Sequence, residues 1–340
     1  MDSLELLQEL VSVPGPPGQE DQVREVLIKH LVKLGLTSQV DPKGNLIVRL
    51  GSGGKSKVVV TAHMDEIALF VKQVLPDGSL KVAPLGGIFP WKLGEGPVTV
   101  MSQQGSFEAI LGFGSIHTES NLSGAKRAKT DVLTWDMATV TTGQTADNLK
   151  KKGVRPGTRV VVSPSRRSLT HFGNLVSGYF LDDRADLVSW LLAIEQLKDS
   201  PFSITFVATT SEEVGGEGAQ YFLAQEQPDI CIALELGPNV PDAPVTIDAR
   251  PTVWVIDGYA SMPPFLGDLL DKVSSDTGIG LQYQALSRGG SDASCSASRG
   301  LCAHPLTLGL AMENSHGYEV IHKDSMNTLA DLTVAVIKAL

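Results

Sequence analysis

Two histidines and several acidic residues lie at or near the ends of expected strands, where they could bind metal ions. They are His63 with Asp65 and Glu66, Asp182 with Asp183, Glu212 with Glu213, and then Glu235 and His316. No cysteine is among them, and nitrogen and oxygen ligands without thiolate suit a catalytic Zn²⁺, Co²⁺ or Mn²⁺ rather than a structural zinc. Several carboxylates in one cleft would repel one another unless cations neutralised them. The residues therefore predict two divalent metal ions that share a bridging carboxylate.

Short apolar strands are expected to bring these residues together. Strands are predicted at 58–61, 204–208 and 230–234, each followed closely by a histidine or a carboxylate, and an element at 178–181 runs into Asp182. In open α/β sheets, functional groups gather at the carboxyl ends of the strands. We therefore expect the candidate ligands to converge in one cleft.

Helices alternate with these strands along the chain. Apolar stripes with helical spacing predict helices at 4–10, 23–34, 185–197, 265–273 and 329–340. This alternation indicates an α/β fold with a mainly parallel sheet covered on both faces. A Gly-rich turn is expected at 51–55, between two strands.

The middle of the chain has a different residue pattern. From about residue 70 to 170, short β-like runs alternate with Gly and Pro, and helical periodicity is missing. We therefore predict a discontinuous catalytic α/β domain at 1–68 and 171–340, interrupted by a small β-rich domain at 69–170.

Composition limits the classes of partner. The 340 residues are 42% hydrophobic and carry a formal net charge of −10, which is typical of a folded protein that does not bind nucleic acid or anionic membranes. No apolar stretch is long enough to predict a membrane span, and the N-terminal residues lack the basic region of a signal peptide. The three cysteines show no CxxC spacing, so we expect free thiols and a cytoplasmic location.

Five motifs, taken together, are specific. They are Thr61–Ile67, Leu181–Ala185, Ser211–Gly215, Gly289–Ala293, and Ser315-His316 with Glu319–Ile321. In order and spacing they resemble the M42 family of dinuclear-metal aminopeptidases, which includes glutamyl and deblocking aminopeptidases and the tetrahedral TET peptidases. The resemblance covers nearly the whole chain and implies a metallopeptidase fold with an inserted β-rich domain.

The resemblance also implies a set of metal ligands. His63, Asp182 and Glu235 would hold one metal ion, and Asp182, Glu213 and His316 would hold the other. Asp182 would then be the bridging residue. The cofactors expected are two divalent ions per subunit, drawn from zinc, cobalt and manganese.

Two further residues receive roles from the family. Glu212 would be the general base, and Asp65 would hydrogen-bond the far nitrogen of the His63 ring. Spacing alone leaves open whether Asp182 or Asp183 is the bridge, and only the family pattern favours Asp182.

The chain departs from the family pattern at three positions. Glu235 stands where the family usually has Asp, Ala68 where it has Gly, and Ser291 where it has Thr. None of these changes removes a ligand, so we expect a hydrolase that cleaves N-terminal residues from peptides.

The family also implies self-assembly into dimers through the inserted domain, and often into a tetrahedral dodecamer. Two other functions stay open at this stage: another dinuclear-metal amide hydrolase, such as a deacylase or a carboxypeptidase-like enzyme, and a binding protein with a vestigial site.

Overall fold

The computed structural model describes residues 2–51 and 57–340, and within them 11 strands form one mixed sheet. The strand order is β1 (Gln39–Val40), β2 (Leu46–Leu50), β12 (Ile204–Thr209), β3 (Val58–His63), β13 (Ile230–Pro238), β16 (His304–Glu313), β17 (Tyr318–His322), β11 (Leu175–Tyr179) and β10 (Thr170–Phe172). Beside this path, β14 (Thr252–Ile256) pairs with β16 and with β15 (Gln282–Ala285). The central strands β12, β3, β13 and β16 are parallel, as predicted, and the strands at both ends of this order pair antiparallel. Beside them, β14 runs antiparallel to β16 and parallel to β15.

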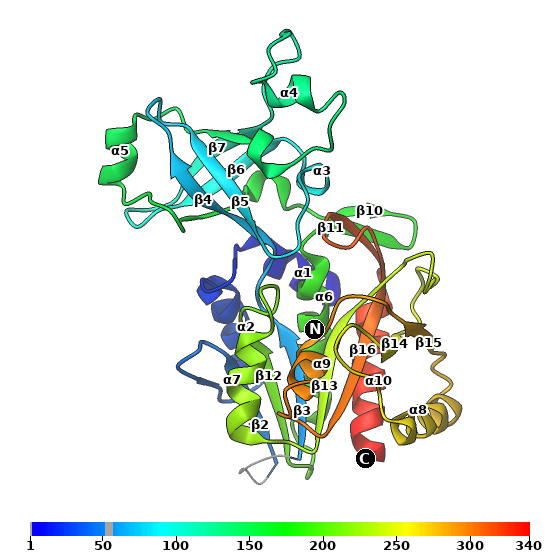
Figure 1. Cartoon of the computed structure of the whole chain (residues 1–340). Coiled ribbons are helices and arrows are strands. Elements are labelled where there is room, and N and C mark those ends of the chain that lie inside the picture. Colours follow the sequence, from blue (N-terminus) through cyan, green and yellow to red (C-terminus); the bar gives the residue numbers. More distant parts are fainter. Residues whose placement is uncertain (1, 52–56) are drawn as a thin grey trace.

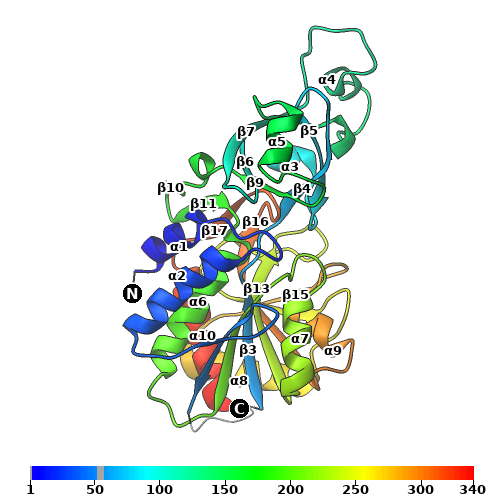
Figure 2. The same cartoon turned by 90° about the vertical axis from the view of Figure 1, so that its left-hand side faces the viewer.

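Helices cover both faces of this sheet (Figure 2). One face carries α1 (Ser3–Ser12), α2 (Asp21–Lys33), α6 (Leu181–Leu197), α8 (Pro264–Thr277) and α10 (Ser325–Ala339). The other carries α7 (Glu217–Glu226) and α9 (Asp292–Ala297). Successive residues of a strand point to opposite faces, so Val60 packs in the first core and Val59 in the second. Because both faces are covered, the central strands are apolar throughout, and all six residues of β12 are buried.

A separate antiparallel barrel lies above the sheet (Figure 1). Its strands are β4 (Ala68–Val74), β5 (Leu80–Leu85), β8 (Thr139–Thr141), β7 (Phe107–Gly112), β6 (Gly96–Met101) and β9 (Arg159–Val162). Short helices connect them: α3 (Pro90–Leu93), α4 (Gly124–Arg127), η1 (Trp135–Met137) and α5 (Ala146–Lys151); η2 (Pro164–Arg166) follows β9 and leads back to the sheet. The barrel has its own apolar core. The domain limits 69–170 and the role of this unit in dimerisation stay predictions.

Two strands differ from the sequence expectation. The strand expected to stop at residue 234 continues to Pro238, because Glu235 and Leu236 pair with Gly309 and Leu310 of β16. Glu235 therefore lies inside β13 rather than after it. The element before Asp182 is β11, which runs antiparallel to β17.

The turn expected at 51–55 falls mostly outside the described residues. No helix in the described part of the chain is both long and apolar enough to cross a membrane.

Candidate metal centre

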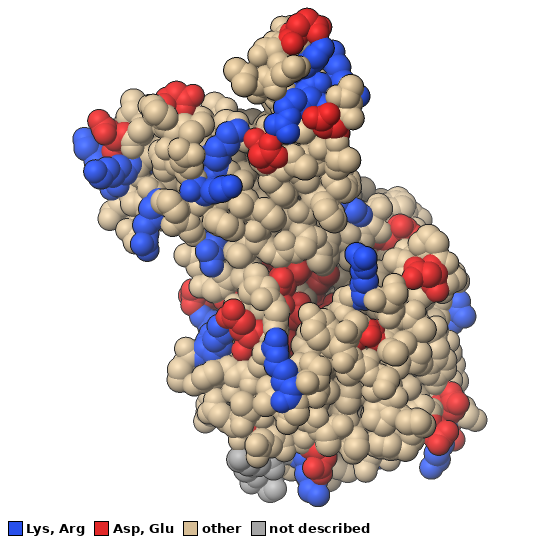
Figure 3. Space-filling model, viewed as in Figure 1, with Lys and Arg blue, Asp and Glu red and all other residues tan. Residues whose placement is uncertain are grey.

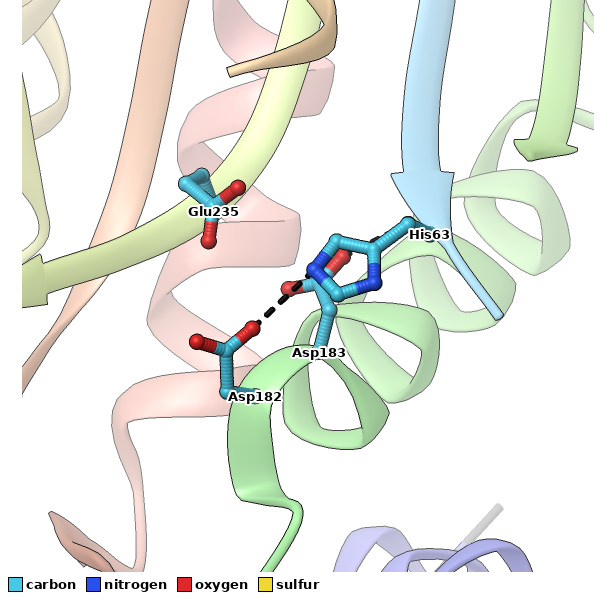
Figure 4. Close-up of side chains that lie close together, drawn as sticks. All are labelled: His63, Asp182, Asp183 and Glu235. Atoms are coloured by element: carbon cyan, nitrogen blue, oxygen red, sulfur yellow. Dashed lines mark hydrogen bonds and ion pairs between the residues drawn. The ribbon is translucent and has the colours of Figure 1, made fainter. Parts of the chain in front are cut away.

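Four buried side chains from three elements meet at the carboxyl end of the central strands. His63 ends β3, Glu235 comes from β13, and Asp182 and Asp183 begin α6. One potential ligand atom from each lies within 4.8 Å of the others. Figure 4 shows the His63 ring facing Asp182, and the Nε2 to Oδ1 distance is 3.0 Å. This set, His63, Asp182, Asp183 and Glu235, is called the first ligand group.

A second group of three side chains shares Asp182. Its members are Asp182, Glu213 and His316, again with one ligand atom each within 4.8 Å. His316 Nε2 lies 3.4 Å from Asp182 Oδ2 and 3.7 Å from Glu213 Oε2. Asp182 thus turns one carboxylate oxygen to His63 and the other to His316. A carboxylate placed in this way can bridge two cations.

Backbone geometry at the start of α6 presents Asp182 and Asp183 to the site. Phe180 has left-handed angles, and Asp182 (φ −74, ψ 105) and Asp183 (φ −114, ψ 27) are not helical, so both residues precede the regular turns of the helix. Glu319 then fixes this loop: its Oε2 accepts the Asp182 N–H at 3.1 Å, and its Oε1 accepts the His316 N–H at 2.8 Å. Glu319 therefore aligns one ligand at the start of α6 and one just before β17.

Asp65 joins two other loops of the site. Its carboxylate accepts the main-chain N–H groups of Glu212 (2.9 Å) and Glu213 (3.1 Å). His63 Nδ1 lies 3.1 Å from the main-chain oxygen of Asp65 and 3.5 Å from its Oδ1. The Nδ1–H group is therefore held mainly by the Asp65 carbonyl, and the carboxylate is its more distant neighbour.

The barrel reaches the site through Gly87. Its carbonyl oxygen lies 2.8 Å from His316 Nδ1, which leaves Nε2 directed to the acidic residues. A ring nitrogen that is held in this way leaves the opposite nitrogen free to bind a metal. Even a Cβ at position 87 would lie only 3.1 Å from His316 Nδ1, so the histidine and the glycine are closely packed.

Burial and mutual repulsion raise the pKa values of several of the carboxyl groups. Burial raises the pKa of Glu213 to about 7. Burial and the neighbouring Asp182 and Asp183 raise the pKa of Glu235 well above its usual range. Burial also raises the pKa of Glu212 strongly. Such an excess of acidic groups is stable when a cation is close by.

The pKa values of both histidines are raised as well, and this favours the charged form of the imidazole. Burial lowers the pKa of His63, but the carboxylates around it, Asp183 foremost, outweigh that effect and raise it well above the usual value. Glu213 and Asp182 raise the pKa of His316 to about 11. Burial favours the protonated form of Asp182, yet hydrogen bonds to His316 and His63 lower its pKa overall.

The donor set fits divalent cations. Asp183 Oδ1 and Glu213 Oε1 are buried and have no hydrogen-bond partner among the described residues. The ligand atoms are carboxylate oxygens and imidazole nitrogens, which suit Zn²⁺, Co²⁺ and Mn²⁺. A bound cation would favour the ionised form of these carboxyl groups.

A cavity of about 440 Å³ opens above the two ligand groups, and Asp182, Glu212, Glu213, Glu235 and both histidines line it. Figure 3 shows acidic side chains in a hollow between the barrel and the sheet. Glu212 lines this cavity without belonging to either ligand group. Asp65 lies beneath it and is fully buried.

Comparison with known proteins identifies the family. The family model for M42 glutamyl aminopeptidase matches residues 44–332. The chain belongs to the M42 glutamyl aminopeptidase family. Its M42 relatives include the lysyl aminopeptidase of Pyrococcus furiosus, 28% identical over 288 residues that cover 82% of this chain and 80% of the relative. The glutamyl aminopeptidase of Lactococcus lactis is 24% identical over 334 residues, which cover 94% of this chain and 91% of that protein.

Solved structures agree with this membership of the M42 family. An aminopeptidase from the archaeon Desulfurococcus kamchatkensis has a TM-score of 0.88 and 26% identity, covering 99% of this chain and 95% of that one. The TET1 peptidase of Pyrococcus horikoshii, which can assemble into a tetrahedron or a large octahedral shell, has a TM-score of 0.86 and 26% identity over 98% of both chains. The predicted fold, enzyme class and aminopeptidase function are therefore confirmed, and a deacylase or carboxypeptidase-like activity is not favoured.

Two contributors to the M42 site received no role from the sequence: Glu319, which aligns two ligands, and Gly87, which holds His316. Asp183, which spacing left open as the bridging residue, belongs to the first ligand group. Of the two that were missed, only Glu319 had a usable signal, since it follows His316 by three residues in a quoted motif. The main-chain oxygen of Gly87 has no signature in a sequence.

Proposed function

We propose that this M42 peptidase removes N-terminal residues from peptides with two divalent cations bound in the two ligand groups. The observation that carries the proposal is the sharing of Asp182 between the groups, with one oxygen directed to each histidine. Divalent cations held there would polarise the scissile carbonyl and lower the pKa of the attacking water.

The two ligand sets follow from the same contacts. His63, Asp182 and Glu235 would hold one cation, and Asp182, Glu213 and His316 the other. Asp182 suits the bridging role better than Asp183. The Oδ2 atom of Asp183 already accepts the main-chain N–H of His63 at 2.7 Å, and Asp183 belongs to one group only.

Glu212 is proposed as the general base. Its carboxyl faces the cavity, its main-chain N–H is anchored by Asp65, and neither ligand group includes it. Burial raises its pKa, so the carboxylate, once bound cations favour its ionised form, would take a proton from the attacking water and pass it to the leaving amine. The carboxylates around the cavity would also bind the free α-amine of the substrate, which restricts cleavage to N-terminal residues.

Replacing Glu212 by Gln tests this role. Turnover of aminoacyl-p-nitroanilides should fall by ~10² or more, while the metal content measured by mass spectrometry stays at the wild-type value. Glu217→Gln is a matched control, because Glu217 is exposed on α7 and lies outside the cavity lining. Near-normal turnover in Glu212→Gln would refute the general-base role, and a loss of metal would make Glu212 a ligand instead.

We further propose a homo-oligomer, built from dimers and reaching a tetrahedral dodecamer. One TET structure of the same fold is a dodecamer, and a TET1 peptidase can assemble into a tetrahedron. Light scattering after size-exclusion chromatography measures the mass directly. A cytoplasmic location is proposed from the three cysteines, all buried and free. The native cation, whether zinc, cobalt or manganese, is to be identified by elemental analysis of the purified protein.

A further inference from the structure

The segment that carries Glu212 and Glu213 begins with an unusual backbone conformation. Ser211, directly before Glu212, has a φ of 56°, in the left-handed region that residues other than glycine adopt at a cost in energy. It is buried, and it follows shortly after the end of β12. Such a conformation persists only where surrounding groups hold it. The placement of Glu212 at the cavity therefore depends on the groups that hold Ser211.

Side chains from the N-terminal part of the chain hold this segment. Oε1 of Glu20 accepts the Ser211 N–H at 3.2 Å and lies 3.5 Å from the Ser211 hydroxyl oxygen. The N–H groups on either side are held in the same way: that of residue 210 by Asn45, and those of residues 212 and 213 by Asp65. Four successive N–H groups are thus bound by side chains, and Glu20 binds the one at the left-handed residue.

Glu20 is itself fixed in place. It is only 3% exposed, and the same Oε1 atom accepts the Gly18 N–H at 2.7 Å. Arg159 of the barrel strand β9 donates to the neighbouring Pro17 carbonyl at 2.9 Å. Glu20 directly precedes α2, but its side chain makes no capping hydrogen bond to that helix. Its carboxylate therefore supports Ser211 and the adjoining turn rather than α2.

We propose that Glu20 is a positioning residue for the peptidase reaction and acts through Ser211 on Glu212. The inference rests on the proposed function, in which Glu212 is the general base. Glu20 belongs to neither ligand group and does not line the cavity, so it is not placed to touch a cation or the substrate. Its hydrogen bond fixes the main chain from which the Glu212 carboxyl reaches the attacking water, and a displacement of ~1 Å there is enough to lower the rate.

Three substitutions separate the hydrogen bond of Glu20 from its charge. Glu20→Met removes the acceptor oxygen at nearly the same side-chain length. Glu20→Gln keeps an acceptor oxygen without the charge. Glu20→Asp keeps the charge on a side chain one methylene shorter, which no longer reaches the Ser211 N–H, and it decides the question if Glu20→Met does not fold. Glu25→Met is the matched control, because Glu25 is exposed on α2.

The expected result is a fall in kcat without a change in substrate or metal binding. With aminoacyl-p-nitroanilides, Glu20→Met and Glu20→Asp should lower kcat roughly tenfold or more, with KM within about threefold of the wild type and metal content unchanged. Glu20→Gln and Glu25→Met should keep kcat within about threefold of the wild type. Wild-type kcat in Glu20→Met and Glu20→Asp, an equal fall in Glu20→Gln, or a loss of metal that accounts for the fall would overturn the inference.

A double substitution tests whether Glu20 acts through Glu212. In Glu212→Gln the general base is absent, so adding Glu20→Met should lower the remaining turnover by less than about twofold. A residue that supports the fold in general would instead lower turnover by the same factor in both backgrounds. If the two effects multiply in this way, Glu20 does not act through Glu212 and the inference is wrong.

Amide hydrogen exchange separates this inference from the proposed function, because it needs no turnover. In the metal-loaded protein, Glu20→Met should speed exchange of the N–H groups at 210–213 roughly tenfold or more, measured by mass spectrometry, and Glu20→Gln should not. This result supports the anchoring by Glu20 even if Glu212 is not the general base, and unchanged exchange in Glu20→Met refutes it. Normal turnover in Glu20→Met, together with the expected loss in Glu212→Gln, would leave the proposed function standing and refute the inference alone.

Discussion

Removing bound cations and then raising the pH should destabilise the protein, because its buried carboxyl groups would have to ionise without a partner. Burial raises the pKa of Glu213 to about 7 and that of Glu319 to about 8. In the unfolded chain both groups lose their protons at about pH 4.5. Between these values the folded state holds more protons, so stability is greatest at low pH and is lost as the pH rises through 7 and 8.

The size of the loss in stability follows from the pKa shift of Glu213 between the unfolded and the folded chain. Each pKa unit corresponds to about 1.4 kcal/mol, so Glu213 alone contributes a loss of about 3 kcal/mol between pH 5 and pH 8. The side chain of Glu213 is only 5% exposed, so solvent screens the effect little. A bound cation favours the ionised carboxylate and should abolish the loss.

Urea unfolding at pH 5, 6, 7 and 8, with a chelator and with excess Zn²⁺ or Mn²⁺, measures this dependence. Glu213→Gln cannot titrate, so its metal-free form should lose about 3 kcal/mol less than the wild type over this range. Glu217→Gln should follow the wild type, since its side chain is exposed. A metal-free wild-type protein whose stability is flat or rises from pH 5 to pH 8 would refute the electrostatic account of the site.

Two further substitutions test how the ligands are supported. Glu66 is fully buried and paired with the buried Arg167 and Arg184. Glu66→Gln should therefore lower the free energy of unfolding, measured by urea titration, by ~3–5 kcal/mol. A decrease of less than about 1 kcal/mol would contradict a stabilising role for these ion pairs. Glu319→Gln keeps only one acceptor oxygen for the N–H groups of Asp182 and His316. Metal affinity, measured by competition with a chelator, should therefore fall by ~10–100-fold. An unchanged affinity would exclude the role of Glu319 in aligning the two ligands.

Much of the fold and part of the site could be predicted because they depend on local patterns. The apolar runs that become β3, β12 and β13 mark the central strands, and His63 stands at the end of one of them. The position of Glu235 was anticipated, although the strand continues past it. The end of β13 is set by its pairing with β16, whose residues lie more than 70 positions further along the chain.

The parts that could not be predicted depend on contacts between distant segments. The antiparallel direction of β11 follows from its pairing with β17, near the other end of the chain. Asp183 faces His63 only because the residues at the start of α6 are not helical. The position of His316 is set by the carboxylate of Glu319 and the carbonyl of Gly87, and neither contact leaves a periodic pattern in the sequence.

The barrel is mechanically part of the metal centre. Arg167 follows its last strand β9 and is 2% exposed. It donates to the carbonyl of Val162 at the end of that strand, to the carbonyls of Val11 in the last turn of α1 and Val13 just after it, and to the carboxylate of Glu66. Glu66 lies three residues after His63, and Gly87, on the barrel side, holds His316. His316 therefore contacts the barrel side directly, and the segment that carries His63 is linked to it through Glu66 and Arg167. A shift of the barrel relative to the sheet should therefore change both ligand groups together. Metal affinity should change when the barrel shifts in this way.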